Sequence, residues 1–333
     1  MGRSNVCSKT RTDNKPEDTD IYDARNYLYL SERKQDLLRF YDSFASASDL
    51  VAWMRNRPRG ESNILRVSGE NDDIVVVIPT MSVNNNFAKT CLKIFKGFEL
   101  IFVESGVGNR YFNFAHNCNV GFRYVLDNLN PSWIVYSNDD MYSIDSPKTL
   151  ENELGNIRGE PSIVFAGLNS HYHSYVSRFL QPSYAHYLMS RIIGGSMRVS
   201  VDLQRKFGID YLPVWDGKVD LKTKLSRKIL QRKIASVINS GSFGIFNYGY
   251  VRKVSGNVYD DTFITGLEDI DLSIRAAKEG IAYSFINYQI GDRVGQSSPS
   301  GISRYLKNMA NYAYLNAKHP LKSISGLQMS FNS

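Results

Sequence analysis

Apolar residues along this chain fall into two kinds of pattern, short continuous runs and longer runs with helical spacing. The clearest continuous run is Ile74-Val75-Val76-Val77-Ile78, which is typical of a parallel strand covered on both faces, and Pro79-Thr80 ends it. Similar runs predict strands at 100–103, 133–136, 162–165 and 242–246. Helical spacing predicts helices at 87–96, 111–128, 146–154, 268–279 and 301–318. Strands that alternate with helices in this way predict an α/β fold with a Rossmann-like, doubly wound, mostly parallel sheet.

The same patterns divide the chain into regions. Residues 1–20 are polar and charged, as is typical of disordered chain. Residues 21–70 carry amphipathic helical patterns, and we expect an N-terminal helical extension that covers the core; a partner-binding extension is the alternative. The sheet would then comprise a first half at 71–165 and a second half at 166–300, followed by a C-terminal helix and tail at 301–333.

The second half contains a strongly basic segment, residues 218–238, in which apolar side chains recur at roughly helical spacing. They are Leu221, Leu225, Ile229, Ile234 and Ile238. We expect an amphipathic helix here, which would make this insertion helical. Such a helix either packs its apolar face on the core or lies on an anionic membrane surface, and nucleic-acid contact is a third alternative.

Composition narrows the class of protein. The 333 residues carry a net charge of +7, which suits anionic partners such as nucleotides, phospholipid head groups or nucleic acid without choosing among them. No apolar run approaches the roughly 20 residues that cross a bilayer, and the polar N-terminus does not resemble a signal peptide. Three scattered cysteines are too few for a disulfide framework or a zinc site. We therefore expect a cytoplasmic protein, with peripheral membrane contact through 218–238 as an alternative.

A first acidic cluster, Asn138-Asp139-Asp140, directly follows the predicted strand at 133–136. Ligands on doubly wound sheets bind at the carboxyl ends of strands, and adjacent carboxylates there repel each other unless a cation or a donor-rich ligand neutralises them. Carboxylate oxygens are the ligands that Mg²⁺ and Mn²⁺ prefer. We expect Asp140 to be the direct metal ligand and Asp139 to lie near a ribose or a metal-bound water. A solvated acidic turn is the alternative.

A second acidic pair, Glu268 and Asp269, stands where a helix is predicted to begin. The helix dipole favours ionised carboxylates there by about 0.3–1 kcal/mol, so simple charge compensation is one explanation. Gly266 before the pair would let a ligand approach closely, which favours a functional explanation. We expect Asp269 to remove the proton from an attacking hydroxyl group and Glu268 to hold the acceptor.

Several motifs between Ile74 and His319 together resemble the family 2 glycosyltransferases, which have the GT-A fold. Ile78-Pro79-Thr80 resembles the end of the family's first strand, and Glu104 stands where the family has an acidic residue, usually Asp, that meets the nucleoside base. The remaining matches are the helix motif Asn119-Val120-Gly121, the metal motif at Asn138, the strand motif Gly241-Ser242-Phe243, the aromatic Phe263, and the Glu-Asp-x-Asp-Leu helix at Glu268.

The resemblance implies an inverting, metal-dependent, hexosyltransferase-like enzyme. Its donor would be a nucleotide-diphosphate sugar, and its acceptor a hydroxyl group of a saccharide, a lipid-linked molecule or a protein. Residues 71–165 would bind the nucleotide sugar and 166–300 the acceptor. The donor-binding residues would be Pro79, Thr80, Glu104, Asn138 and Asp139; the ligands of Mn²⁺ or Mg²⁺ would be Asp140 and Asp139; the catalytic residues would be Asp269 and Glu268.

Two departures from the family pattern keep other functions open. Asn138 stands where the family has Asp, and Asp292-Arg293 occupies the neighbourhood of a His that many relatives carry. A catalytically dead relative that acts as a membrane or nucleic-acid adaptor is therefore one alternative, although no specific nucleic-acid contact is expected. A nucleotidyltransferase is another, but residues 80–86 lack the Gly and Lys of a triphosphate loop.

Overall fold

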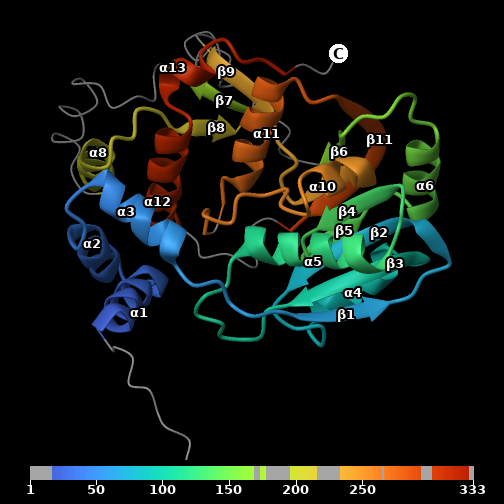
Figure 1. Cartoon of the computed structure of the whole chain (residues 1–333), viewed down its shortest axis with the longest axis horizontal. Coiled ribbons are helices and arrows are strands. Elements are labelled where there is room, and N and C mark those ends of the chain that lie inside the picture. Colours follow the sequence, from blue (N-terminus) through green and yellow to red (C-terminus); the bar gives the residue numbers. More distant parts are fainter. Residues whose placement is uncertain are drawn as a thin grey trace, which may run out of the picture.

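The computed structural model describes residues 17–168, 173–177, 196–215, 233–264, 266–293 and 302–329. Within these ranges the protein is a mixed α/β structure built on a curled sheet of eight strands in the order β1-β3-β2-β4-β10-β6-β11-β5 (Figure 1). The strands are β1 (Asn63–Val67), β2 (Asn71–Thr80), β3 (Phe98–Glu104), β4 (Trp133–Ser137), β5 (Met141–Ser143), β6 (Ile163–Leu168), β10 (Phe243–Asn247) and β11 (Tyr283–Asp292).

The sheet is mostly parallel, as the sequence predicts. Strands β2, β3, β4, β6 and β11 run in one direction, and β1, β5 and β10 run in the other. Strand β10 is antiparallel to both of its neighbours, β4 and β6. The start of β10 therefore lies at the same edge of the sheet as the carboxyl end of β4, where the first acidic cluster follows.

Both faces of the sheet are covered, which explains the unbroken apolar run in β2. Val75 and Val77 join one buried cluster and Ile74, Val76 and Ile78 join the other, because successive strand residues point to opposite faces. Helix α5 (Phe114–Asn128) covers the first face; α4 (Asn86–Ile94) and α6 (Pro147–Gly155) cover the second. Their N-caps, Asn113, Asn85 and Ser146, each accept a backbone N–H from their own first turn.

The N-terminal region contains three helices, α1 (Glu17–Leu30), α2 (Lys34–Asp42) and α3 (Ala47–Asn56). Two predictions are wrong here: helix α1 already begins at Glu17, within the segment expected to be disordered, and β1 interrupts the extension expected to be helical throughout. Strand β1 is recruited because its backbone pairs with the edge strand β3. Helices α2 and α3 pack against α12 (Ile302–Lys318) and bury aromatic side chains such as Phe40 and Trp53 (Figure 1).

The insertion in the second half contains strands as well as a helix. Strands β7 (His173–Ser177), β8 (Pro213–Trp215) and β9 (Lys233–Ile238) form a separate antiparallel sheet, and α8 (Ser196–Lys206) lies between β7 and β8 in the chain. The prediction of a helix is wrong for 233–238. Ile234 and Ile238 are four residues apart, and an even spacing also places two residues on one face of a strand. The rest of the predicted basic helix, 218–232, lies outside the described residues.

Three further helices complete the described part of the chain: α10 (Tyr248–Lys253), α11 (Glu268–Glu279) and α13 (Leu321–Ile324). Helix α11 begins and ends within one residue of its predicted bounds, and Gly280 closes it at a φ of 62°. None of the helices described here combines the length and the apolar character that a bilayer crossing requires.

Candidate functional site

The first acidic cluster lies where β2, β3 and β4 end side by side. The hydroxyl group of Thr80, at the end of β2, donates a hydrogen bond of 2.7 Å to Asp139 Oδ2. The side-chain amide of Asn85 donates to the same oxygen at 3.5 Å. Pro79 lies one residue earlier in β2, opposite Val103 of β3. The predicted donor-binding residues of β2 and β4 therefore meet at one edge of the sheet.

Glu104, at the end of β3, belongs to the same edge. Its carboxylate accepts a hydrogen bond of 3.0 Å from the backbone N–H of Val83, in the loop that follows β2. Ser105 donates its backbone N–H to the carbonyl of Thr80 at 3.0 Å. These contacts fix the loops after β2 and β3 against each other, and they place Glu104 beside the first acidic cluster.

Burial dominates the electrostatics of this cluster. It raises the pKa of Asp139, and the hydrogen bonds from Thr80 and Asn85 oppose the increase. The Cys91 thiol donates to the carbonyl of Asp139 at 3.3 Å, and burial together with the charges of Asp139 and Asp140 raises its pKa to about 12. Cys91 is therefore a neutral support beneath the cluster and not a nucleophile.

The cluster suits a cation that is held only partly by protein. Within the described ranges, no group of three or more His, Cys, Asp or Glu side chains is arranged to hold a metal ion. Asp139 and Asp140 are nevertheless adjacent, and Oδ1 of Asn138 is buried with no hydrogen-bond partner among those residues. Mg²⁺ in proteins commonly takes one or two carboxylates and completes its shell with water and substrate phosphates. These donors fit that mode of binding.

The second acidic pair begins α11 after an unusual turn. Gly266 has a φ of 130° and Leu267 a φ of 72°, and such a conformation costs a residue with a side chain about 1–3 kcal/mol. Glu268 and Asp269 follow, with exposed fractions of only 9% and 6%. Asp269 accepts hydrogen bonds through both oxygens, from the backbone N–H of Ile270 at 2.8 Å and from the side-chain amide of Asn239 at 2.7 Å.

These contacts make the two carboxyl groups unequal. Burial raises the pKa of both, and the neighbouring charge of Asp269 helps to raise the pKa of Glu268 to about 8. The hydrogen bonds from Asn239 and Ile270 favour the charged form of Asp269 and oppose its shift. Within the pair, these contacts therefore favour the charge on Asp269 and the proton on Glu268.

The two acidic clusters, about 130 residues apart in sequence, meet through the short segment Asn239–Ser242. Ser242 accepts the backbone N–H of Asn138 at 2.9 Å, and its hydroxyl group donates to Asp292 at the end of β11. Asn239, which holds Asp269, is three residues earlier, and three residues span at most about 11 Å. The predicted donor-side and catalytic residues therefore share one site.

Sequence reasoning missed Asn239 and the role of Asp271. The only signal for Asn239 is its position two residues before the Gly241-Ser242-Phe243 motif. Asp271 is fully buried; it forms ion pairs with Arg275 and Lys318 and a hydrogen bond with His319, at 2.8–2.9 Å. The last two residues lie at the end of α12, so Asp271 fastens α11 to that helix.

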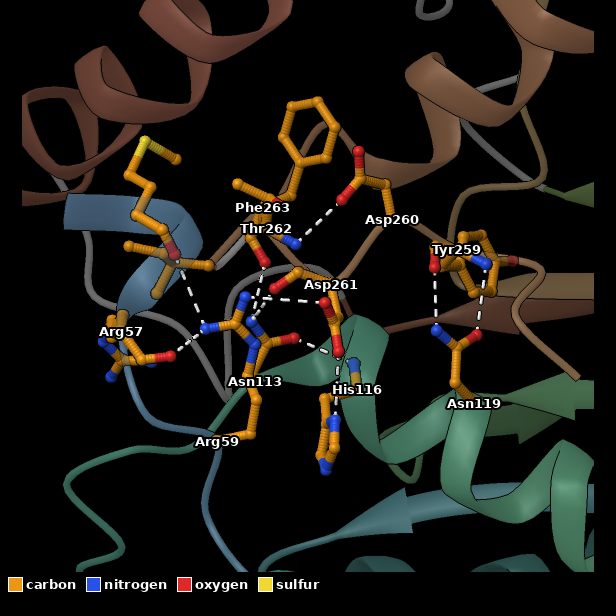
Figure 2. Close-up of polar contacts among 12 residues, drawn as sticks. Arg57, Arg59, Asn113, His116, Asn119, Tyr259, Asp260, Asp261, Thr262 and Phe263 are labelled. Carbon is orange, nitrogen blue, oxygen red and sulfur yellow. Dashed lines mark hydrogen bonds and ion pairs between the residues drawn. The ribbon is translucent and has the colours of Figure 1, made fainter. Parts of the chain in front are cut away.

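The loop that leads into α11 is fixed to α5, as Figure 2 shows. The Asn119 side chain donates to the carbonyl of Tyr259 at 2.7 Å and accepts its N–H at 3.1 Å. Asn113 donates to the carbonyls of Asp261 and Phe263, and the Asp261 carboxylate contacts Arg59 and His116. These contacts set the path of the chain just before Gly266, and they give Asn119 a structural role.

A scan against models of protein families finds no match to this chain, and a search of curated proteins finds none either.

Proposed function

We propose that this protein is a metal-assisted, inverting glycosyltransferase of the GT-A type, which transfers a sugar from a nucleotide-diphosphate donor to a hydroxyl acceptor. The observation that carries the proposal is the meeting of two different acidic sites across Asn239–Ser242. One is a set of oxygen ligands at the carboxyl ends of parallel strands, and the other is a buried carboxylate at a helix start. The first suits a diphosphate with its cation, and the second suits a hydroxyl nucleophile.

On the donor side, Pro79, Thr80 and Glu104 line the nucleoside, and Asp140 with Asp139 holds Mg²⁺ or Mn²⁺. When bound, the cation would offset the negative charge of the diphosphate. The protein's own contribution is position: Thr80 and Asn85 hold the Asp139 carboxylate in one orientation. A sugar donor held in this way would react faster mainly because the reacting groups are already oriented and little reorganisation is needed during the reaction.

On the acceptor side, the ionised Asp269 takes the proton of the acceptor hydroxyl group as that oxygen attacks the anomeric carbon of the sugar. The new carbon–oxygen bond forms on the face opposite the diphosphate. As it forms, the bond between the anomeric carbon and the diphosphate oxygen breaks, and the diphosphate leaves with both electrons. Inversion follows from this geometry. Glu268, neutral at physiological pH, donates a hydrogen bond that orients the acceptor.

Thermal unfolding in the presence of donors tests this function. The full chain would be heated with a panel of nucleotide-diphosphate sugars, each with and without Mn²⁺ or Mg²⁺. A donor present at a hundredfold excess over its dissociation constant stabilises the folded state by about 2.7 kcal/mol. We expect one nucleotide to stabilise the protein in a metal-dependent way, and Asp140→Asn to remove that dependence. The exposed Asp127→Asn serves as the matched control.

Absence of stabilisation by every donor at millimolar concentration would contradict the proposal. It would favour a catalytically dead relative instead, since Asn138 already departs from the family's metal motif. For any donor that does stabilise the protein, a direct transfer assay distinguishes an active transferase from a protein that only binds the donor. Formation of the free nucleoside diphosphate only in the presence of an acceptor would identify transfer and exclude simple hydrolysis.

A further inference from the structure

Asn239 is a buried amide where the three-stranded sheet of β7, β8 and β9 meets the site. It directly follows β9, is 1% exposed, and its Nδ2 lies 2.7 Å from Asp269 Oδ2. An amide N–H can only donate, so this contact stabilises the ionised carboxylate more than the neutral acid. The contact therefore favours the ionised form of Asp269.

The pKa of Glu268 is not lowered by a side-chain donor of this kind. The hydrogen bonds that lower its pKa come from the backbone of Gly266 and of Glu268 itself, whereas Asp269 has the Asn239 side chain in addition to backbone donors. Both residues lie in the first turn of α11 and both are deeply buried. Asn239 is therefore the side chain that makes this pair of carboxyl groups asymmetric.

The other groups around the pair do not supply this asymmetry. The charge of Asp269 acts on Tyr136 and that of Glu268 on Cys118, but burial raises the pKa of each well above its ordinary value, so both are neutral at physiological pH. The charge of Asp271 also acts on Glu268, but that carboxylate is already paired with Arg275, Lys318 and His319. The backbone N–H of Gly241 adds to the donors around Asp269.

We infer that Asn239 is a positioning residue that keeps the charge of the acidic pair on Asp269 and so sets the acid limit of the enzyme's activity. This inference rests on the proposed function, because it assigns Asp269 the role of base. Without Asn239 the proton would be shared between the two carboxyl groups, and the base would be lost at a higher pH. Above that pH the base would be ionised again, and the rate would recover.

The test is Asn239→Leu in the full chain, which keeps the size of the side chain and removes the donor. A hydrogen bond to a charged group is worth one to two pH units on the titration of that group. We expect the midpoint of Asp269, followed by ¹³C NMR of labelled carboxyl groups and assigned with Asp269→Asn, to rise by about that amount. The acid limb of kcat/KM should move with it, and the rate above the limb should return to within about threefold of the original.

Asn316→Leu is the matched control, because Asn316 is also a buried amide but binds the backbone of Tyr211. It should lower stability without moving the Asp269 titration. An equal loss of rate at every pH after Asn239→Leu, with an unchanged Asp269 midpoint, would overturn the inference. If that variant does not fold, Asn239→Ser and Asn239→Ala form a second pair. Serine keeps a donor and should leave the midpoint lower than alanine does, and equal midpoints would overturn the inference.

The NMR titration needs no substrate, which separates this inference from the proposed function. A shifted Asp269 midpoint in a protein that transfers no sugar would uphold the electrostatic role of Asn239 and remove the proposed enzyme. An unshifted midpoint in an active transferase would uphold the proposed enzyme and overturn the electrostatic role of Asn239.

Discussion

Buried and half-buried aspartates of this protein have pKa values shifted in opposite directions, and a neighbouring cation decides which. Burial raises the pKa of Asp139 and Asp269, whose polar neighbours are neutral amides and hydroxyl groups. Lys318 and Tyr314 instead hold the pKa of Asp260 at about 2, against the opposing effect of burial. A raised pKa without a cation therefore distinguishes the candidate site from the structural ion pairs.

The first prediction concerns the base. Replacing Asp269 with Asn should lower the rate of transfer by about 10²–10⁴-fold, the usual contribution of general base catalysis, while the donor's dissociation constant changes less than about twofold. Steady-state kinetics and calorimetric titration of the donor measure the two quantities. Asp127→Asn, on the exposed surface of α5, is the control. A loss of donor binding as large as the loss of rate would refute this role.

The second prediction concerns the stability cost of Glu268. Its pKa rises from 4.5 in the unfolded chain to about 8 in the folded protein, so the folded state keeps a proton that the unfolded chain releases. The contribution of Glu268 to stability is complete below pH 4.5 and is lost as the pH rises towards 8, with a slope of at most about 1.4 kcal/mol per pH unit. Glu268→Gln should therefore stabilise the protein more at pH 8 than at pH 5.

Urea unfolding at several pH values measures this effect. Glu151→Gln, which makes the same substitution at a partly exposed position of α6, is the matched control. A stability difference between Glu268→Gln and the parent that does not change between pH 5 and pH 8 would show that Glu268 is ionised in the folded protein.

At the scale of secondary structure elements, helix α5 approaches the sheet closely at Gly121. A Cβ atom added at Gly121 would lie 2.3 Å from Val77 Cγ1 in β2 and 2.9 Å from Val103 Cγ2 in β3. The residue two positions earlier, Asn119, binds the backbone of Tyr259. The Asn-x-Gly motif therefore has a structural explanation: it seats the helix on the sheet and fastens the loop before α11 to it.

The third prediction follows from that packing. Gly121→Ala should destabilise the protein by about 1–3 kcal/mol, the usual cost of overpacking a core, and chemical denaturation measures it. Gly155→Ala is the matched control because nothing lies within 4 Å of its added Cβ atom. That variant should be neutral or slightly stabilising. Equal effects of the two substitutions would mean that α5 has room to move away from β2 and β3.

Local patterns predict most elements of this fold because period and capping are local properties. The helices at Phe114–Asn128 and Glu268–Glu279 and the strand at Asn71–Thr80 lie close to their predicted positions. Strand Asn63–Val67 was missed because only pairing with β3 gives it a structure. Strand Lys233–Ile238 was mistaken for a helix because its apolar spacing fits both periods.

The candidate site, too, could be predicted from the sequence only where its residues are close together in the chain. Its carboxylates could be identified from sequence because they are adjacent and follow strands or begin a helix. Their partners could not, since Asn239 lies 30 residues from Asp269, and Lys318 lies 47 residues from Asp271. Contacts of this range depend on the tertiary fold. The raised pKa values of Glu268 and Asp269 depend on burial, and their inequality depends on the distant Asn239; adjacent sequence encodes neither.

At the scale of the whole molecule, a partly buried network of charged side chains joins the site to the end of α12. Asp271 on α11 pairs with Lys318 at 2.8 Å, and Lys318 also pairs with Asp260 in the loop before that helix. His319 contacts Asp271 at 2.8 Å and Lys278 at 3.0 Å. These contacts fix the orientation of α11, and with it that of Asp269, against the C-terminal end of α12.

The fourth prediction tests this network. Asp271→Ala leaves the half-buried Arg275 and Lys318 without their shared carboxylate, and we expect it to cost about 1–3 kcal/mol of folding free energy, measured by urea unfolding. Glu151→Ala breaks the exposed ion pair with Lys148 and should cost less than about 1 kcal/mol. A loss below 1 kcal/mol for Asp271→Ala would show that the cations find other partners or reach solvent.

The packing of α2 against α12 also bears on how the protein is made. Tyr41 accepts the backbone N–H of Ala310 at 3.0 Å, across 269 residues of chain. Ribosomes add about 5–20 residues per second, so α2 emerges roughly 13 to 54 seconds before its partner helix exists. Throughout that interval α12 is not yet there to cover the N-terminal helices and their aromatic side chains, such as Phe40 and Phe44. Nascent chains that stop short of residue 302 should therefore be bound by chaperones that recognise exposed aromatic segments, and completed chains should be released from them.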